Sequence, residues 1–342
     1  MSSFFSSEPV WILDTGRVGE RAQCERVAEA LGLPFRNVPL NPDFTAPARW
    51  PDTSGLRLIL SFGNAVRAAQ ALRASCAVRP LVVQIGRPSH VPITDLDLII
   101  SLPQDDYPSG PNILKSAWPL NGASLQPLPV IPEEQRTAGT VVLYGAPSRQ
   151  FYMGHTETQR LLRFATELAR ANGEPLHLIA SPRTPPDLWD YLQAHAKTSG
   201  FSLYPFRRED NQFDRLLQTG SRFVVTADSA SMLAEAWRTR APVWLFPLPR
   251  RETGMTRAQR TLDALGLRPV RYTLVRRGVL GSGANFAHWH KTLIRGGEIR
   301  RADLPLSAEA LRWRPSSHRP EEDLLRLRRS ILALPGLQKE RT

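Results

Sequence analysis

One stretch decides the fold: Phe223-Val224-Val225-Thr226-Ala227-Asp228-Ser229-Ala230-Ser231-Met232-Leu233-Ala234-Glu235-Ala236. Its apolar first part predicts a short buried strand, and the spacing after it predicts a helix. The turn between them is rich in residues that cap helices. A helix N-terminus offers N–H groups and partial positive charge, which suits a phosphate, and Glu235 can accept hydrogen bonds from sugar hydroxyls. The turn is therefore either an ordinary capped helix or a nucleotide or nucleotide-sugar site.

The same strand-to-helix pattern recurs along the chain. Apolar runs predict strands at 9–14, 56–61, 80–85, 96–101, 140–144, 176–180, 202–205, 222–226 and 242–246. Amphipathic or alanine-rich segments follow several of them, as at 65–74 and 156–172. Strands that alternate with helices imply parallel sheets with right-handed crossovers. The sequence therefore predicts an α/β fold.

A change of composition divides the chain into two α/β halves. Three prolines, Pro127, Pro129 and Pro132, interrupt the apolar pattern. We expect an N-terminal Rossmann-like domain at 1–125, a linker at 126–138 and a C-terminal Rossmann-like domain at 139–310. The remaining tail, 311–342, contains an amphipathic helix that we expect to dock on a domain, although a basic helix of this kind can also lie on a membrane.

Composition favours a globular chain in a reducing compartment. The 342 residues are 42% hydrophobic and 22% charged, and we find no run of ~20 apolar residues for a membrane helix. Met1–Val10 has neither a charged start nor a long apolar core, so we expect no signal peptide. Cys24 and Cys76 are isolated and predict free thiols, as in a cytoplasmic protein. The net charge of +12 favours an anionic partner, but its arginine bias also fits a GC-rich genome. Signatures of nucleic-acid binding are missing, so nucleic acid is not expected as a partner.

Standard motifs of several enzyme classes are missing. The chain lacks GxGxxG, GxxxxGK[ST] and GxSxG, which disfavours dinucleotide enzymes, P-loop NTPases and α/β-hydrolases. His288 and His290 would share one face of a strand as metal ligands, but surface histidines explain them better, and we expect no metal. Asp105 and Asp106 supply a candidate general base or, equally, a solvated turn.

A second turn suits a phosphate. Gly145-Ala146-Pro147-Ser148-Arg149 follows the first strand of the second half. It offers backbone N–H groups, the Ser148 hydroxyl and the Arg149 guanidinium to a diphosphate. We expect this loop and the turn at 228–232 to lie at the same carboxyl edge of the sheet, where ligands bind in such folds.

Several blocks of the chain resemble one family. They are 13–20 (LDTGRVGE), 28–32 (AEALG), 83–85 (VQI), 97–100 (DLII), 110–114 (GPNIL), 181–185 (SPRTP), and 225–232 (VTADSASM) continued by Glu235 and Ala236. Together they resemble the mitochondrial-fission "elongated mitochondria" family and its bacterial relatives. The resemblance covers most of the chain.

That resemblance implies a GT-B arrangement with an inter-domain cleft, as in MurG-type glycosyltransferases. By analogy, backbone N–H groups of Ser231 and Met232, with Thr226 and Ser229 in the same turn, bind the donor diphosphate. Glu235 holds the ribose. Phe206 and Arg207 contact the base, and Gly145, Ser148 and Arg149 face the phosphates. Gly16, Arg17 and Gly19 face the acceptor. Catalysis would then use Glu20, Asp105 or Asp106 as base.

The chain departs from the family pattern near its acceptor side. Glu20 stands close to the place of a histidine. Arg21 stands where asparagine or an equivalent polar residue is common, and Gly86-Arg87 replaces a polar charged pair.

The resulting hypothesis is a metal-independent GT-B-like glycosyltransferase without cofactor. Its donor would be a nucleotide-diphosphate sugar, with a UDP-sugar favoured, and its acceptor an envelope glycan or glycolipid. The enzyme would be cytoplasmic or peripheral on the inner face of the cytoplasmic membrane. The alternatives are a non-catalytic adaptor of the mitochondrial-fission type, acting by binding a partner or an anionic membrane, and a nucleotide-sugar 2-epimerase-like enzyme.

Overall fold

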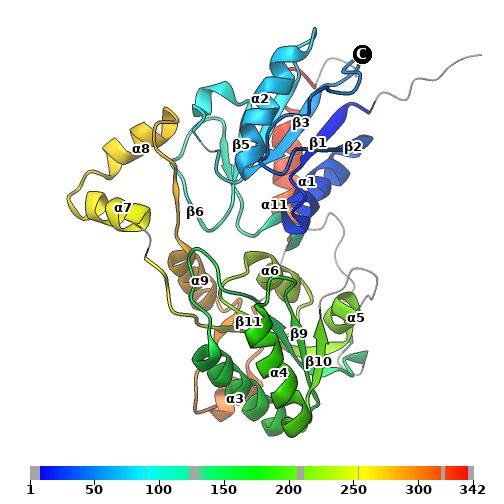
Figure 1. Ribbon diagram of the computed structural model, residues 1–342, viewed down its shortest axis with the longest axis vertical. Coiled ribbons are helices and arrows are strands. Elements are labelled where there is room, and N and C mark those ends of the chain that lie inside the picture. The colour runs from blue at the N-terminus through cyan, green and yellow to red at the C-terminus, as the bar shows by residue number, and fades with distance from the viewer. Residues whose placement is uncertain are drawn as a thin grey trace, which may run out of the picture. The chain divides into compact units, whose positions relative to one another are not determined.

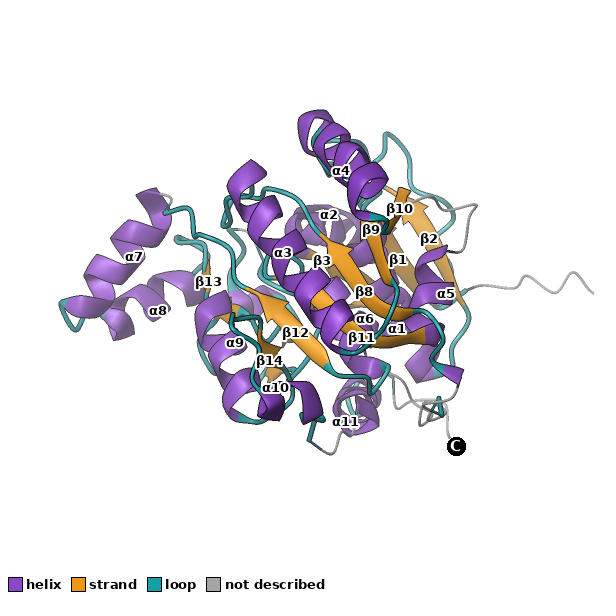
Figure 2. Cartoon of the chain, turned by 90° about the horizontal axis from the view of Figure 1, so that it is seen from below, coloured by secondary structure: helices purple, strands orange, loops and turns teal. Residues whose placement is uncertain are grey.

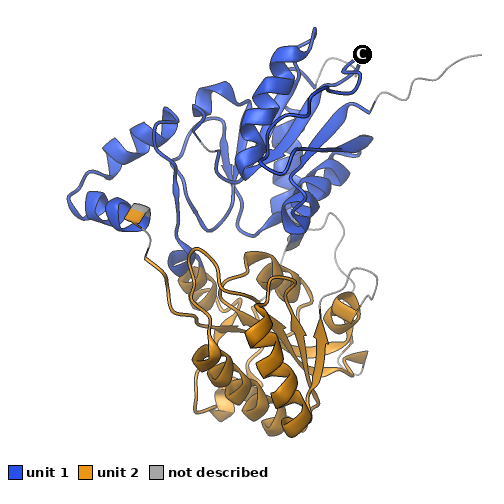
Figure 3. Cartoon of the chain, in the orientation of Figure 1, with its two compact units in different colours: residues 1–127, 255–289, 319–342 blue, residues 128–254, 290–318 orange. Residues whose placement is uncertain are grey.

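The chain folds into two compact units, each built on its own sheet. The computed structural model describes residues 8–88, 90–122, 131–132, 135–205, 212–252, 254–316 and 320–337. Unit 1 contains 1–127, 255–289 and 319–342, and unit 2 contains 128–254 and 290–318 (Figure 3). Among the described residues no helix is long and apolar enough to span a bilayer.

Unit 1 contains a six-stranded parallel sheet in the order β2-β1-β3-β4-β5-β7. The strands are β1 (Val10–Asp14), β2 (Phe35–Pro39), β3 (Leu58–Phe62), β4 (Leu81–Ile85), β5 (Leu98–Ser101) and β7 (Ile113–Lys115). Helix α1 (Val18–Leu31) connects β1 to β2, and α2 (Val66–Ser75) connects β3 to β4. Since the two right-handed crossovers run in opposite directions, the helices cover opposite faces of the sheet.

Alternation along the strands builds two apolar cores in unit 1. Val10 and Ile12 join a cluster with Val27 and Leu31 of α1, whereas Trp11 and Leu13 join a cluster around α2. Successive side chains of a strand point to opposite faces, so one strand supplies both cores.

The C-terminal helix α11 (Pro320–Leu332) packs in the first of these cores. Leu324, Leu327 and Ile331 are buried among residues of α1 and the sheet. The Asp323 carboxylate accepts a 2.5 Å hydrogen bond from the amide of Ala117. The apolar face of the tail helix is therefore covered within unit 1.

Unit 2 repeats the parallel plan in the order β10-β9-β8-β11-β12-β14 (Figures 1 and 2). Its strands are β8 (Gly139–Tyr144), β9 (Leu176–Ala180), β10 (Ser202–Pro205), β11 (Gly220–Thr226), β12 (Val243–Phe246) and β14 (Arg300–Arg301). Its helices are α3 (His155–Ala171), α4 (Pro186–Ser199), α5 (Gln212–Thr219), α6 (Ala230–Arg238) and α10 (Ala308–Arg312). The predicted α/β class with two Rossmann-like domains is confirmed.

Segment 255–289 follows unit 2 in the sequence but packs in unit 1. It contains all but the first residue of α7 (Gly254–Ala264), together with α8 (Arg268–Arg276) and β13 (Gly283–Ala284), and α9 (Phe286–Arg295) begins at its end. Strand β13 pairs antiparallel with β6 (Asp105–Asp106). The predicted second domain, 139–310, thus includes a segment that these contacts tie to unit 1.

Candidate functional site

The two phosphate-suited turns of the sequence flank the point where strand order reverses in unit 2. The chain moves from β8 to β9 and β10 on one side, and then returns to place β11 on the other side of β8. The loop after β8 begins at Gly145, and the turn after β11 begins at Ala227. Ligands of open α/β sheets bind at the carboxyl ends of strands beside such a reversal.

Hydrogen bonds join these two turns directly. The Gly145 amide donates to Thr226 Oγ1 at 2.9 Å, and the Ala146 amide donates to Asp228 Oδ2 at 3.1 Å. A Cβ atom at Gly145 would lie 2.1 Å from Asp228 Oδ1, so a side chain there does not fit. Position 145 therefore requires glycine because of the close approach of the Asp228 carboxylate.

Asp228 is buried at the junction, and this burial raises the pKa of its carboxyl group, while the hydrogen bond from Thr226 opposes the rise. Within the described part of the chain, Asp228 Oδ1 has no hydrogen-bond partner. The Arg183 guanidinium lies 3.8 Å from Asp228 Oδ2, and its side chain is 59% exposed. Arg183 thus offers positive charge to solvent beside the turn.

Several N–H groups of the loop after β8 already donate hydrogen bonds within the protein. The Ser148 amide donates to the carbonyl oxygen of Phe151, and the Ser148 hydroxyl accepts from the amides of Gln150 and Phe151. With Gly145 and Ala146 also engaged and Pro147 lacking an N–H, the exposed Arg149 side chain is the group that the loop presents outward.

This loop also joins the loop that follows β12. The Tyr152 amide donates to the Pro249 carbonyl at 2.8 Å, and the Arg251 amide donates to the Gln150 carbonyl at 2.8 Å. Because β11 lies between β8 and β12, the joined loops span the carboxyl end of β11. Three strands of this edge, β8, β9 and β12, are each followed by an arginine: Arg149, Arg183 and Arg250. These side chains make the edge electropositive.

Helix α6 starts at the turn as the sequence predicts. Ser229 is its N-cap, and the Ser229 hydroxyl accepts a 3.3 Å hydrogen bond from the Met232 amide. The Met232 amide, which we expected to donate a hydrogen bond to a phosphate, therefore donates to the cap instead. The Ser229 hydroxyl can still donate its own proton to a ligand. Ser231 lies in the first turn of the helix, whose partial positive charge faces the carboxyl edge.

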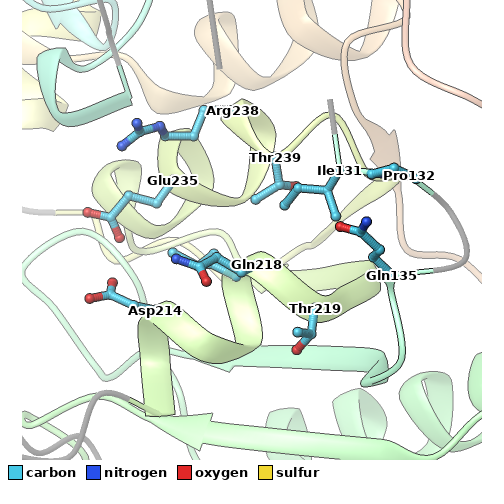
Figure 4. A pocket seen from close by; sticks show the side chains of 10 residues that line it. Ile131, Pro132, Gln135, Asp214, Gln218, Thr219, Glu235, Arg238 and Thr239 are labelled. Carbon is cyan, nitrogen blue, oxygen red and sulfur yellow. The ribbon is translucent and has the colours of Figure 1, made fainter. Parts of the chain in front are cut away.

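Glu235, further along α6, lines a pocket of about 530 Å³ within unit 2. The pocket lies between α5 and α6, and its lining residues are Ile131, Pro132, Gln135, Asp214, Leu217, Gln218, Thr219, Glu235, Arg238 and Thr239. Figure 4 shows the carboxylates of Glu235 and Asp214 at the same end. Two carboxylates that line one pocket are suited to accept hydrogen bonds from the hydroxyls of a sugar. The predicted base contacts, Phe206 and Arg207, lie outside the described residues.

The predicted acceptor loop lies at the carboxyl end of β1 in unit 1. Gly16 adopts a φ of 75°, and its amide donates to Asp14 Oδ1 at 2.8 Å. Glu20 accepts from Thr15 Oγ1 at 2.7 Å and pairs with Arg17 at 2.8 Å, while the Arg17 guanidinium lies over the Phe44 ring. Gly19 is in the first turn of α1. Glu20 therefore orders the loop and keeps its carboxylate partly exposed.

The two aspartates of β6 have different environments. The side chain of Asp105 is 3% exposed and pairs with Arg87 at 3.1 Å, and burial raises its pKa to about 6. Asp106 accepts from Tyr272 Oη at 2.7 Å and from Arg271 at 2.7 Å. Burial opposes the effect of these partners, but together they lower the pKa of Asp106. Asp106 therefore anchors α8 to β6 and is engaged in structure.

His288 and His290 do not share a strand face, and the expectation that both are surface histidines is correct for His288 and wrong for the buried His290. Both lie in helix α9, where residues two apart point in different directions. His288 is exposed. His290 is buried, and its ring stacks on that of Phe151 with 6.5 Å between the ring centroids. In the described ranges no cluster of three or more histidine, cysteine or acidic side chains could hold a metal ion.

The sequence model of the family described as Mitochondrial fission ELM1 matches residues 18–290. The chain belongs to the ELM1 family. This match includes the loop after β8, the β11–α6 turn and the Glu235 helix. No curated protein matches this ELM1-family chain.

Solved structures show a distant likeness. The UDP-GlcNAc 2-epimerase of Methanocaldococcus jannaschii, in complex with UDP-GlcNAc and UDP, is 8% identical with a TM-score of 0.48 over 94% of this chain and 98% of that one. The Neisseria meningitidis UDP-GlcNAc 2-epimerase bound to UDP-GlcNAc is 10% identical, with a TM-score of 0.41 over 84% and 98% of the respective chains. A Thermobaculum terrenum O-GlcNAc transferase mutant is 12% identical, with a TM-score of 0.39 over 96% of this chain and 64% of that one.

Sequence reasoning missed two arginines of the unit 2 edge as site candidates. Arg183 lies in the block 181–185, which drew attention as a resemblance only, and Arg250 follows β12 in a loop without a recognised motif. Their positions could have indicated them, because each lies in the loop that follows a parallel strand. Neighbours at the carboxyl edge are set by strand order, which one sequence does not show.

Proposed function

We propose that this ELM1-family protein binds a nucleotide-diphosphate sugar at the carboxyl edge of unit 2 and transfers the sugar to an acceptor. The observation that carries the proposal is the hydrogen bond between Gly145 and Thr226, which joins the two phosphate-suited turns beside the strand-order reversal. UDP is the favoured nucleotide, and a lipid-linked or envelope glycan is the favoured acceptor.

The diphosphate would bind at the start of α6. There it would meet the Ser229 hydroxyl, the partial charge of the helix N-terminus and the guanidinium groups of Arg149 and Arg183. The same positive groups would stabilise the charge that develops on the departing diphosphate, so the proposed reaction requires no metal ion.

The ribose would bind in the pocket between α5 and α6. Glu235 is six residues beyond the Ser229 cap, about 9 Å along the helix axis. A ribose joined to a diphosphate is long enough to reach from one to the other. Glu235 and Asp214 would then accept the hydrogen bonds of the ribose hydroxyls.

The proposal assigns the general base to Glu20 and the acceptor loop to Gly16, Arg17 and Gly19. Glu20 is preferred to Asp106 because Asp106 compensates the fully buried Arg271, whereas the partner of Glu20, Arg17, is 59% exposed and free to change partners. Asp105 remains the second candidate, because its pKa of about 6 suits proton transfer near neutral pH.

Nucleotide binding tests the donor site. Thermal shift and calorimetry with UDP, GDP, ADP and CMP compare wild type with Glu235→Ala, and Glu167→Ala on α3 serves as a surface control. We expect a diphosphate nucleotide to stabilise wild type and the control, and Glu235→Ala to bind about tenfold more weakly. If no nucleotide binds wild type at millimolar concentration, the proposal fails.

Product analysis then tests the reaction. Wild type should release nucleotide diphosphate from the sugar donor only when an acceptor extract is present, and Glu20→Gln should lose this activity while still binding the donor. Conversion of the donor alone would instead identify a 2-epimerase-like enzyme. Binding without any turnover would favour a non-catalytic adaptor.

A further inference from the structure

The hairpin of α7 and α8 exposes apolar side chains at its tip. Leu265 and Leu267 form the turn between the helices, and Val270 is in the first turn of α8. These side chains are 67%, 40% and 55% exposed. Other large apolar side chains with such exposure are mostly scattered singly on the molecule, whereas these three lie within six residues. We call residues 265–270 the hairpin tip.

The hairpin that carries this tip is strongly basic. Its arginines are Arg257, Arg260, Arg268, Arg271, Arg276 and Arg277, and its one acidic residue is Asp263. Asp263 is engaged inside the hairpin by Arg271. Arg268, beside the tip, keeps 57% of its side chain exposed. Arg268 and Arg271 share the Asp106 carboxylate of β6, so the arginines still outnumber the acidic groups that pair with them. The apolar tip therefore lies on a hairpin of net positive charge.

Buried ion pairs hold the hairpin in shape. Arg271 has no exposed surface, and it binds Asp263 of α7 at 2.8 Å and Asp106 of β6 at 2.7 Å. The Gln259 side-chain amide donates to the Gly281 carbonyl at 3.2 Å. Figures 1 and 2 show α7 and α8 as a neighbouring pair of helices, apart from the other helices of unit 1. These bonds hold α7 and α8 in place, so the tip is exposed on a folded hairpin.

We propose that the hairpin tip inserts into an anionic lipid surface. Leucine and valine side chains would enter the boundary between headgroups and acyl chains, and the exposed Arg268, Arg276 and Arg277 would bind lipid phosphates. Excess positive charge favours an anionic bilayer over a neutral one or over a second copy of this basic chain. The inference concerns residues outside the donor site, and it stands whether or not the protein transfers a sugar.

Vesicle sedimentation tests this docking surface. The full-length protein is mixed with vesicles of phosphatidylcholine alone or with 30 mol% phosphatidylglycerol (about one lipid in three), at low and at high salt. We expect wild type to sediment with the anionic vesicles and to be released as salt screens the arginines. The triple variant L265S/L267S/V270S should bind the anionic vesicles about tenfold more weakly, because its tip can no longer bury apolar surface.

Two further variants make the result specific. V78S removes a similarly exposed valine elsewhere on unit 1 and should bind like wild type. L265F adds apolar surface at the tip and should bind more tightly, which keeps the test valid if the triple variant is less stable. The proposal is overturned if wild type stays in the supernatant, if the triple variant binds like wild type, or if V78S loses as much. It is also overturned if the tip instead holds a dimer in solution that the triple variant dissolves.

Discussion

Gly145 and Asp228 are packed so closely that the carboxylate occupies the space of a side chain at position 145. The site of a Cβ atom is 2.1 Å from Asp228 Oδ1 and 2.3 Å from Oδ2. Gly145→Ala must therefore displace the carboxylate and the hydrogen bonds that join the two turns. We expect a loss of about 1–3 kcal/mol in the free energy of unfolding, together with weaker nucleotide binding.

Chemical denaturation and calorimetry check this expectation. Gly254→Ala is the matched control, since a Cβ there meets nothing within 4 Å. Equal stability of Gly145→Ala and wild type would show that the turns tolerate separation, and the assigned role of their junction would then be wrong.

Arg183 should matter for binding and hardly at all for stability. Its ion pair with Asp228 is long, at 3.8 Å, and its side chain is 59% exposed, so the pair contributes little to folding. A guanidinium that pairs with a phosphate contributes more. We expect Arg183→Ala to weaken binding of a nucleoside diphosphate about tenfold, with a melting temperature close to that of wild type.

Calorimetric titration with UDP at two salt concentrations measures the effect. Arg163→Ala is the control, since Arg163 is an exposed residue of α3 whose partner is Glu167. A similar loss in both variants would indicate a nonspecific effect of net charge.

Local patterns predicted the βα units closely because each depends on neighbouring residues. The strands at 176–180 and 202–205 coincide with β9 and β10, and α6 begins after the Ser229 cap. Short edge strands such as β2 and β14 were missed, because Phe35–Pro39 and Arg300–Arg301 alternate poorly and gain their pairing from the sheet.

The membership of 255–289 in unit 1 was not predictable from local pattern. It rests on pairs far apart in the sequence, such as Asp106 with Arg271 and β6 with β13. The same limit applies to the site. Sequence placed Glu235 on a helix after a phosphate-suited turn. It did not indicate that Asp214 lines the same pocket, because α5 and α6 meet at this pocket only in the folded chain.

Asp106 provides a test that separates structure from catalysis. Asp106→Asn removes one of the two carboxylates that compensate the buried Arg271, and it also weakens the bond to Tyr272. A buried charge that loses a partner is costly, so we expect a loss of about 3 kcal/mol. Asp303→Asn, which breaks an exposed pair with Arg301, should cost under about 0.5 kcal/mol.

Urea denaturation gives both values, and turnover measured on the folded fraction gives the second readout. Asp106→Asn should keep its activity per folded molecule, whereas Glu20→Gln should lose activity at unchanged stability. Loss of turnover in stable Asp106→Asn protein would move the catalytic role from Glu20 to Asp106.

His290 should make unit 2 sensitive to mild acid. Burial, assisted by the charge of Arg250, lowers its pKa to about 4 from the ordinary 6.5. The unfolded chain therefore takes up a proton near pH 6.5, while the folded chain resists until about pH 4. The stabilisation is complete above pH 6.5 and is lost as pH falls toward 4, by about 3 kcal/mol in total.

The measurement is the free energy of unfolding at intervals from pH 7 to pH 4, in wild type and in His290→Gln. The difference between them should shift in favour of the variant by about 3 kcal/mol as the pH falls. His155→Gln, which replaces an exposed histidine of α3, is the control for general acid effects. Because glutamine does not titrate in this range, parallel curves for wild type and His290→Gln would mean that the buried imidazole accepts a proton in the folded protein, and the stacked position on Phe151 would then not exclude the charge.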